Sequence, residues 1–504
     1  MITLDGRSVT IDAVADVARN FTPVAISPDA TARMDHSHRL MLDLIAHGHP
    51  IYGVTTGLAD RKGSPIPPEE TDAFQRRIVL SHVVGVGPAL GPDVVRAVMV
   101  ARVNMLAAGG SGARGTIADG LIALLNQRIH PCVPASGSLG VTDLTHLAHI
   151  AQVLLGEGTV EVAGEVMPAG AALSAAGLTP LQLGPKEGLA LISSNAGSVG
   201  RGAVVLWDLE WLVVTLDVAA ALSIEAFRAN VAPFAPDVER AHPDLGQAAT
   251  AQRLRRLLAG SDLHVPGAAR SLQDPYSFRC VPQTHGVLRN SLAAARSVIE
   301  LELNAAADTP LISVDGGRVV SNGNFLALGV AVAFEQLAIA LAHATALSVE
   351  RLRALLSGRM TGLPGTLIEA ATPQTGLCIL QEAAGSLQTG IRARANPSSL
   401  DFAPIADGVE DHATNAMDAV AKVEADIQDA VSIVGIELLA AAQAVDLRGA
   451  IHLGAGTQAA RDLVRREVPF LREDTPLAPL IEALALRVRS GAFVEEVEQS
   501  LPGA

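Results

Sequence analysis

The chain has 504 residues, of which 49% are hydrophobic, 18% charged and 3% aromatic. This much apolar side chain can form a large core, so the composition speaks against a disordered or low-complexity protein. The net charge of −15 speaks against binding to nucleic acid or to an anionic membrane, because both need a basic face.

The N-terminal segment and the cysteines indicate a cytoplasmic protein. Residues 1–20 contain charged side chains, Asp5 and Arg7 among them, and so lack the uncharged core of a signal peptide. The longest uncharged stretch, Val166–Pro185, is interrupted by prolines and glycines and is not expected to span a membrane. The three cysteines cannot all pair, and neither they nor the 14 histidines show the spacing of a metal site. We therefore expect a reducing compartment and no bound metal.

Residues 1–190 predict a loop-rich N-terminal domain that contains short helices. Glycine, proline and other turn residues recur along this region and interrupt its apolar periodicity. A partly alternating segment, Val160–Gly170, predicts a short strand or hairpin. The spacing of apolar residues predicts helices over Thr31–His47, Pro92–Ala108 and Leu144–Leu155.

Residues 191–504 predict a second domain, a central bundle of long helices with a helical C-terminal tail. Its helical segments are rich in alanine and leucine and are apolar round much of their surface, as helices buried on several sides are. We therefore expect a mainly all-α fold whose bundle extends across the subunits of an oligomer. The long segments are Gly202–Asn230, Gly286–Asn304, Phe325–Leu356 and Met417–Leu447.

General motifs leave the function open. The sequence contains no Walker loop and no HExxH, CxxC or GxSxG motif. Glu410-Asp411-His412 combines acidic and basic groups, but three adjacent helical residues are expected to point in different directions and not to form a ligand set. The rarest residue type is more informative, because the chain has only two tyrosines, Tyr52 and Tyr276.

Several segments, taken in their order along the chain, resemble the histidine and phenylalanine ammonia-lyases. The block Gln273–Cys280, which reads Gln-Asp-Pro-Tyr-Ser-Phe-Arg-Cys, is the most specific, and the other segments gain weight from their order. The resemblance covers residues 1 to about 450, and both tyrosines lie in its motifs. The other matching segments include Tyr52-Gly53-Val54-Thr55-Thr56-Gly57, Leu80-Ser81-His82, Asn324-Phe325 and Glu410-Asp411-His412.

The resemblance implies a mostly helical homotetramer with active sites shared between subunits. Members of that family remove an α-amino group and a β-proton from an amino acid by means of an electrophile, the methylidene-imidazolone (MIO) group, which forms from an Ala-Ser-Gly triad of the chain. Tyr52 would then be the base and Arg279 the partner of the substrate carboxylate. The resemblance also implies catalytic roles for Tyr276 and Glu410. It places substrate contacts at His82, Asn195, Gln273, Asn324, Phe325 and Gln381. His82 and Glu410 would both face the substrate side chain, and such a pair suits a polar heterocycle.

The sequence departs from that family where the electrophile forms. Gly137–Leu144 matches the stretch around the triad, but one residue is missing and Val141 and Thr142 replace the triad itself. Cyclisation needs a serine hydroxyl and a glycine nitrogen, and the third position is either absent or Asp143. Two supporting segments also differ, with Ser193-Ser194 in place of Asn-Gly and Leu326-Ala327-Leu328 in place of His-x-Glu.

These clustered departures predict a carbon–nitrogen lyase without the MIO group or any other cofactor. Its histidine-like or other amino-acid substrate would carry a nitrogen that leaves well, such as the trimethylammonium of a betaine, and would yield an α,β-unsaturated acid. Two alternatives stay open. An ammonia-lyase or aminomutase could form MIO from the displaced Ala135-Ser136-Gly137. A non-catalytic homologue could bind a small molecule without the chemistry.

Overall fold

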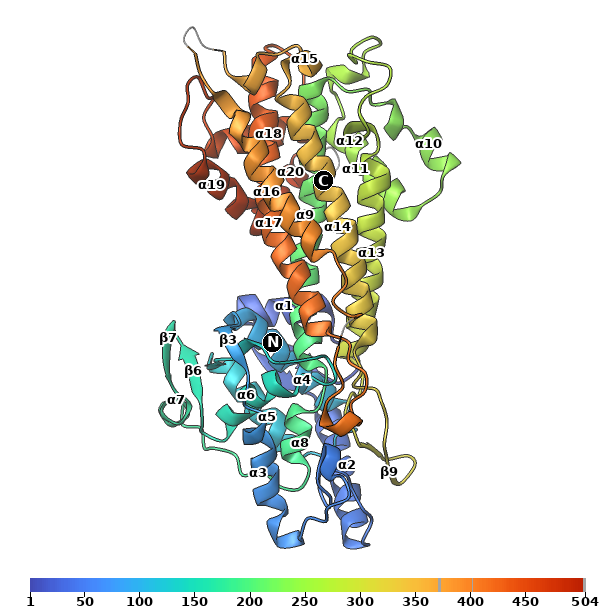
Figure 1. Cartoon of the computed structure of the whole chain (residues 1–504), viewed down its shortest axis with the longest axis vertical. Coiled ribbons are helices and arrows are strands. Elements are labelled where there is room, and N and C mark those ends of the chain that lie inside the picture. The colour runs from blue at the N-terminus through green and yellow to red at the C-terminus, as the bar shows by residue number, and fades with distance from the viewer. Residues whose placement is uncertain (370–372, 401, 502–504) are drawn as a thin grey trace. The chain divides into compact units, whose positions relative to one another are not determined.

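The protein is mainly helical over the residues that its computed structural model describes, which are 1–369, 373–400 and 402–501 (Figure 1). This confirms the fold class expected from the sequence. The four longest helices lie close to the predicted segments, because alanine and leucine favour helix and proline is absent from the helix interiors. They are α9 (Ala196–Phe227), α13 (Val281–Leu303), α14 (Leu328–Leu355) and α17 (Ala416–Leu447).

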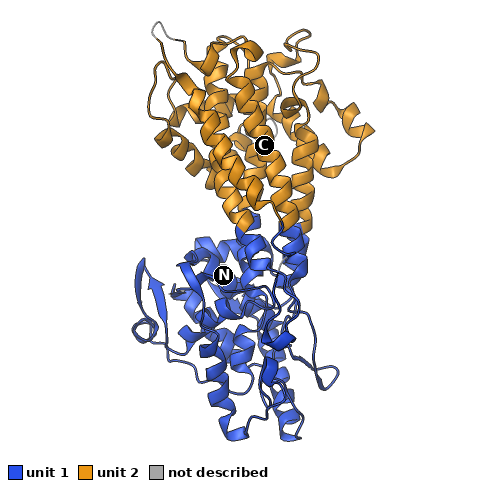
Figure 2. Ribbon diagram, in the orientation of Figure 1, with its two compact units in different colours: residues 1–207, 295–334, 397–421 blue, residues 208–294, 335–396, 422–504 orange. Residues whose placement is uncertain are grey.

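The chain forms two compact units, each assembled from three separate stretches (Figure 2). This division differs from the predicted boundary between residues 190 and 191, because each of the four longest helices contributes residues to both units. Unit 1 consists of residues 1–207, 295–334 and 397–421, and unit 2 of residues 208–294, 335–396 and 422–504.

Unit 1 is organised around α4 (Pro92–Ala107), which is buried at every position from Val94 to Ala107. Such a helix has to be covered on all sides. It packs against α1 (Ile11–Asn20), α2 (Pro28–Ala46) and α5 (Gly115–Asn126). The other helices of this unit are α3 (Thr71–Ser81), α6 (Leu144–Leu154), α7 (Ala169–Ala175) and α8 (Glu187–Ile192), with 3-10 helices η1 (Ala59–Arg61), η2 (Pro68–Glu70) and η7 (Ala406–Gly408).

All strands of the described residues belong to unit 1. The predicted hairpin forms as β6 (Thr159–Val162) and β7 (Glu165–Pro168), and β4 (His130–Pro131) pairs with the other edge of β6. β3 (Val86–Ala89) pairs antiparallel with β5 (Pro134–Ser136). The remaining pairs are β1 (Ile2–Leu4) with β2 (Val24–Ile26), which is parallel, and β8 (Leu311–Ser313) with β9 (Arg318–Val320), which is antiparallel.

Unit 2 is a bundle in which parts of the four long helices lie side by side (Figure 1). Buried polar groups join them. Asp217 of α9 and His285 of α13 are 2.7 Å apart, and Ser223 of α9 donates to Glu437 of α17 at 2.7 Å. The other helices are α10 (Pro236–Ala241), α11 (Leu245–Leu257), α12 (Tyr276–Arg279), α15 (Gly358–Thr361), α16 (Leu380–Arg394), α18 (Ala455–Glu467), α19 (Ala478–Arg489) and α20 (Ala492–Gln499), with 3-10 helices η3 (Ala232–Phe234), η4 (Asp262–His264), η5 (Gly365–Leu367) and η6 (Gly376–Ile379).

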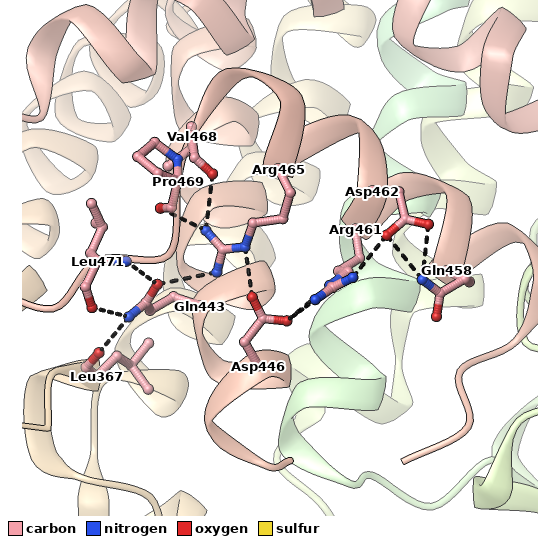
Figure 3. A network of polar contacts seen from close by, with 10 residues as sticks. All are labelled: Leu367, Gln443, Asp446, Gln458, Arg461, Asp462, Arg465, Val468, Pro469 and Leu471. Atoms are coloured by element: carbon pink, nitrogen blue, oxygen red, sulfur yellow. Dashed lines mark hydrogen bonds and ion pairs between the residues drawn. The ribbon is translucent and has the colours of Figure 1, made fainter. Parts of the chain in front are cut away.

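A network of polar contacts attaches the C-terminal tail to α17 (Figure 3). Gln443 is fully buried and donates from Nε2 to the carbonyl oxygens of Leu367 and Leu471, at 3.1 and 2.8 Å. Arg465 of α18 donates to Gln443 at 3.1 Å and to Asp446 at 2.7 Å. Because buried amide and carboxylate groups must be satisfied, these bonds fix the tail against the bundle.

Two of the long helices, α14 and α17, are long and apolar enough to cross a membrane by length and composition alone. Their apolar windows are 61% and 83% buried inside the structure. Core helices of soluble proteins pass the same test of length and composition, and the burial of α17 is typical of such a helix, whereas α14 leaves part of its apolar surface exposed.

Candidate active site

Tyr52 lies in a turn of unit 1 whose backbone is held by buried neighbours. Ile51 and Val54 on either side are fully buried. Gly53 has a φ of 71°, and a Cβ at this position would lie 2.6 Å from the side chain of Leu189, so only glycine fits. The turn is therefore rigidly placed, while the side chain of Tyr52 keeps 36% of its surface exposed.

The hydroxyl of Tyr52 accepts a hydrogen bond from the backbone N–H of Ala59 at 2.8 Å. Ala59 has a φ of 50°, a conformation that residues other than glycine adopt rarely. Burial raises the pKa of Tyr52, the bond from Ala59 opposes that shift, and the negative charge of Glu410 adds to it. The N–H donor favours the phenolate, which is the form that can take a proton.

His82 and Glu410 lie close enough to interact electrostatically. Burial raises the pKa of Glu410, and the charge of His82 opposes that shift. His82 is the C-cap residue of α3, and its Nδ1 lies 2.7 Å from the carbonyl oxygen of Ile78. A carbonyl only accepts, so the proton of the neutral ring is on Nδ1, and Nε2 is left as an acceptor.

Glu410 does not belong to a helix, so the expectation of three adjacent helical residues at 410–412 is wrong. It forms an isolated antiparallel bridge with Ile405, on the far side of η7. Asp407 and Gly408 have φ values of 53° and 81°, which turn the backbone back on itself and prevent a helix from continuing. Because η7 packs against η1, this turn brings Glu410 to the segment that contains Ala59.

The stretch that replaces the Ala-Ser-Gly triad is closed by its own hydrogen bonds. Asp143 is fully buried, and its carboxylate accepts from Ser138 Oγ at 2.8 Å, from Ser198 N at 2.6 Å and from Ser198 Oγ at 3.0 Å. Its own N–H donates to the carbonyl oxygen of Ser194 at 2.7 Å. Thr142 has a φ of 69°, which is unusual for a β-branched residue. Asp143 therefore anchors this loop, and both oxygens of its carboxylate already accept hydrogen bonds from within the chain.

Two segments distant in sequence hold the same loop from outside. Val141 forms an antiparallel bridge with Leu326, the first residue of the stretch that replaces His-x-Glu. Thr414 donates from Oγ1 to the carbonyl oxygen of Gly140 at 2.8 Å. Gly140 has a φ of 75°, and a Cβ there would lie 2.2 Å from Oγ1 of Thr414, so the contact requires glycine. The altered positions thus form one connected part of the structure.

Asn195 and Asn324 differ in how they are placed. Asn195 is buried next to the loop, and its Nδ2 donates to Glu302 Oε2 at 2.6 Å. Burial raises the pKa of Glu302, and the bond from Asn195 opposes that shift. Asn324 is exposed and donates to the carbonyl oxygen of Ala306 at 3.4 Å, and Phe325 beside it is partly buried. The Nδ2 of Asn195 is therefore bonded to a protein carboxylate, whereas its Oδ1 is buried without a partner among the described residues.

The other predicted site residues lie in unit 2, and two of them, Tyr276 and Arg279, belong to α12. The guanidinium carbon of Arg279 lies 4.7 Å from the ring centroid of Tyr276, a cation–π contact, and Tyr276 is 69% exposed. Among the described residues no carboxylate forms an ion pair with Arg279, and its Nε is buried without a partner. Asp274 interacts electrostatically with Arg279 but forms no ion pair with it, so the guanidinium can bind an anion from outside the chain.

Gln273 and Gln381 are not joined to this pair by hydrogen bonds within the described parts of the chain. The N–H of Gln273 donates to Ser271 Oγ at 3.2 Å in the loop before α12. Gln381, in the first turn of α16, donates to the carbonyl oxygen of Cys378 at 3.3 Å. The structure thus groups Tyr52, His82 and Glu410 in unit 1 and Tyr276 with Arg279 in unit 2.

The chain is similar to known proteins over almost its whole length. The chain matches the model of the aromatic amino acid lyase family over residues 9–466. It belongs to the aromatic amino acid lyases. It is 37% identical over 501 residues to the histidine ammonia-lyase of Alkaliphilus oremlandii, with 99% of each chain covered.

Two solved structures are similar over almost the whole chain. One is ergothionase, an ergothioneine-degrading enzyme from Treponema denticola in complex with desmethyl-ergothioneine sulfonic acid. It has a TM-score of 0.94 and 33% identity, and the match covers 98% of this chain and 99% of that one. The other is the tyrosine aminomutase of Streptomyces globisporus, with a TM-score of 0.95, 31% identity, and coverage of 100% and 99%. This aromatic amino acid lyase is therefore a carbon–nitrogen lyase of the ammonia-lyase type.

Two groups near the site were not singled out from the sequence. Ala59 acts through its backbone N–H, which every residue except proline has, and its only signal was its place just after the tyrosine motif. Glu302 became recognisable only through its contact with Asn195, which is 107 residues away along the chain. Neither residue type carries a pattern that predicts such a role.

Proposed function

We propose that this lyase eliminates a nitrogen that already leaves well, together with a β-proton, without an MIO group. The proposed substrate is a histidine-like betaine, whose trimethylammonium group leaves as trimethylamine. The observation that carries the proposal is the closed loop around Asp143. This loop contains no serine–glycine pair that could cyclise, and both carboxylate oxygens of Asp143 are already bonded.

The chemistry of the leaving group supports the same substrate class. A primary amine leaves poorly, and adding it to an electrophile is one way to improve it. A trimethylammonium nitrogen has neither an N–H nor a lone pair, so it cannot add to an electrophile and does not need one. Ergothioneine, which the Treponema denticola relative degrades, is itself a trimethylammonium betaine of a histidine-like amino acid.

The displaced triad Ala135-Ser136-Gly137 lies in a geometry that disfavours cyclisation. Ser136 is the last residue of β5 and pairs with Val86 of β3. Ring closure would join the carbonyl carbon of Ala135 to the nitrogen of Gly137, and an extended strand holds these atoms apart. The carbonyl oxygen of Ala135 also lies 3.2 Å from Nε2 of His146. These contacts favour an unmodified strand over a prosthetic group at this position.

In the proposed reaction the phenolate of Tyr52 takes the β-proton. The C–H electron pair becomes the Cα=Cβ double bond while the C–N bond breaks and its electron pair leaves on trimethylamine. The products are an α,β-unsaturated acid, neutral trimethylamine and protonated Tyr52, which returns its proton to solvent. Arg279 binds the substrate carboxylate through two parallel N–H donors, and Tyr276 supports its guanidinium.

The side chain of the substrate is proposed to bind next to His82 and Glu410. Nε2 of His82 accepts no hydrogen bond from any described residue and can accept one from an imidazole N–H of the substrate. Burial raises the pKa of Glu410 because it disfavours the charged carboxylate, so a hydrogen-bond donor on the ligand would stabilise that carboxylate. Further contacts to the substrate are proposed for Asn195, Gln273, Asn324, Phe325 and Gln381.

A substrate panel tests this proposal. We expect trimethylated histidine or its thiol-bearing analogue to give a conjugated acid, seen by ultraviolet absorbance, together with one equivalent of trimethylamine. Histidine and tyrosine should give no product. Turnover of histidine with release of ammonia would contradict the proposal, and binding without turnover of any substrate would indicate a non-catalytic homologue.

The mass of the intact protein tests the absence of the prosthetic group separately. Cyclisation of an Ala-Ser-Gly triad removes two waters from the chain. We expect the mass of the unmodified sequence and no absorbance change on adding borohydride. A mass lower by two waters, lost in a Ser136→Ala variant, would establish MIO at the displaced triad.

We further propose a cytoplasmic homotetramer whose active sites are shared between subunits. In unit 2, α14 and α16 border a groove of about 430 Å³ that is lined by Ile339, His343, Arg353 and Arg392. Ile339 is 45% exposed there, and in the proposed tetramer another chain would cover it. Light scattering should give four times the chain mass for the native protein and a smaller species for Ile339→Asp.

A further inference from the structure

A buried ion pair of unit 2 lies directly beneath α12. Arg351 of α14 and Glu437 of α17 are both fully buried, and the guanidinium donates to the carboxylate from Nε at 2.5 Å and from Nη2 at 2.9 Å. The third nitrogen, Nη1, donates to the carbonyl oxygen of Ser277 at 3.1 Å. Ser277 stands in α12 between Tyr276 and Arg279, so the ion pair is connected to the backbone that carries Arg279.

The carboxylate of Glu437 has no freedom to move. It accepts from Ser223 of α9 at 2.7 Å and from Ser348 of α14, in addition to Arg351. Three long helices therefore fix its position. A guanidinium is planar and presents its donors in a rigid fork, so two bonds to a fixed carboxylate also fix the direction of the third nitrogen. The ion pair thus holds the carbonyl oxygen of Ser277 at a defined place.

α12 depends on such contacts because it has only four residues. A helix this short is not stable by its own hydrogen bonds. Two further contacts attach it and the loop before it. Phe278 stacks on Phe227 with ring centroids 4.2 Å apart, and Asp274 accepts from the N–H of Asn230 at 2.6 Å. The position of α12, which contains Arg279, therefore depends on residues outside this helix.

We propose that Arg351 and Glu437 are positioning residues, which orient Arg279 through Ser277 and so set the affinity for the substrate carboxylate. This inference rests on the proposed role of Arg279. Neither residue reaches the reacting atoms, and each is separated from Arg279 by the backbone of α12. Their loss should weaken carboxylate binding more than it slows the elimination.

The first test is Glu437→Gln in the full-length, assembled protein. The change keeps the size of the side chain and removes the charge that holds Arg351. We expect KM for the betaine, and Kd for the unsaturated acid product, to rise about tenfold, as the loss of one charge-assisted contact predicts, while kcat changes less than about threefold. A roughly tenfold loss in kcat with no change in KM would overturn the proposal.

Glu225→Gln provides a matched control. Glu225 of α9 is also buried and also accepts several hydrogen bonds, from Gly454 N at 2.9 Å, Ser261 Oγ at 2.8 Å and Thr457 Oγ1 at 3.0 Å. None of these partners belongs to α12. We expect its KM to stay within about twofold of the native value. A rise in KM equal to that of Glu437→Gln would show a general loss of structure and not a positioning role.

Hydrogen exchange gives a measurement that does not depend on activity. Peptides that cover α12 should exchange faster in Glu437→Gln and not in Glu225→Gln, whereas peptides around Gly454 should show the reverse. If the native protein turned over no betaine, the proposed function would fail while this crossed pattern could still be measured. Unchanged exchange at α12 in Glu437→Gln would overturn the positioning role by itself.

A double-mutant cycle with Arg279→Lys tests whether the effect passes through Arg279. In that background Glu437→Gln should raise KM less than about twofold further, because the contact it orients is already lost. A full tenfold effect in both backgrounds would contradict the proposal. Should Glu437→Gln not fold, Ser348→Ala removes one donor to Glu437 and should show the same pattern with smaller changes.

Discussion

Two short segments of unit 1 are built in similar ways but leave different groups available. They are the tyrosine turn, residues 51–59, and the loop 137–144. Each contains a non-glycine residue at a positive φ, 50° at Ala59 and 69° at Thr142. At Ala59 the strained backbone directs an N–H at the hydroxyl of Tyr52. In the loop, the hydrogen bonds of Asp143 join the segment to Ser138, Ser194 and Ser198.

The difference shows how a family can lose one catalytic device and keep another. A strained backbone persists where surrounding contacts hold it in place. At the tyrosine turn, the group held in this way is the N–H of Ala59, which donates to the phenol of Tyr52. In the loop, the group held in place is the carboxylate of Asp143, whose oxygens accept hydrogen bonds from Ser138 and Ser198. On our proposal, the aromatic amino acid lyase thus retains Tyr52 as a base and has replaced its electrophile with a structural anchor.

The largest effect is expected for Tyr52→Phe. The variant loses the proposed base, so kcat should fall by about 10²–10⁴-fold, while Kd for the unsaturated acid stays within about twofold. Initial rates and binding titrations measure both. Tyr276→Phe keeps the ring beneath Arg279 and should cost less; a larger loss there than at Tyr52 would exchange the two roles.

Asp143→Ala should destabilise the protein through the loop. It removes a buried carboxylate and leaves the N–H of Ser198 without its acceptor, while the hydroxyls of Ser198 and Ser138 keep only the carbonyl oxygens of Asn195 and Thr142 as acceptors. A loss of about 2–4 kcal/mol in unfolding free energy is expected, measured by denaturant titration. Ser138→Ala, which removes one donor, should cost only about 1 kcal/mol. Equal stability of Asp143→Ala and the native protein would mean that the carboxylate is not an anchor.

Glu410→Gln should change the pH dependence more than the maximal rate. Burial raises the pKa of Tyr52, and the charge of Glu410 adds to that shift. The base must be deprotonated, so activity rises with pH through this pKa. Removing the charge lowers the pKa of Tyr52, and the rising limb of kcat against pH should move to lower pH. A limb that stays in place or moves upward would show that Glu410 does not act on Tyr52 through its charge.

The smallest effects are expected at the two strained residues. Ala59→Gly and Thr142→Gly relieve the positive φ, which stabilises the folded state, but also loosen the unfolded chain, so each should raise stability by no more than about 1 kcal/mol. Ala59→Gly keeps its N–H and should retain activity. Thermal unfolding and initial rates test both, and a loss of activity in Ala59→Gly would show that the methyl group itself matters.

The helices and the family motifs could be predicted from the sequence more easily than the contacts and turns around them. The four long helices were predictable, because alanine-rich and leucine-rich stretches without internal proline favour helix whatever their neighbours. Glu410 was expected in a helix and lies in a turn, because the left-handed residues Asp407 and Gly408 stop the helix. The compact units also cut across the predicted boundary, since one helix can belong to two units.

By itself, the sequence determined the mainly helical fold and the family, and it predicts the replacement of the Ala-Ser-Gly triad at its usual place, since these depend on local composition and on the order of short motifs. Only the tertiary structure decided what Asp143 does, which N–H faces Tyr52 and which ion pair supports α12. Each of these depends on contacts between residues far apart in the chain, such as Arg351 and Ser277, which are separated by 74 positions. Such contacts leave no periodicity or motif in the sequence, because many residue pairs could satisfy the same buried polar groups.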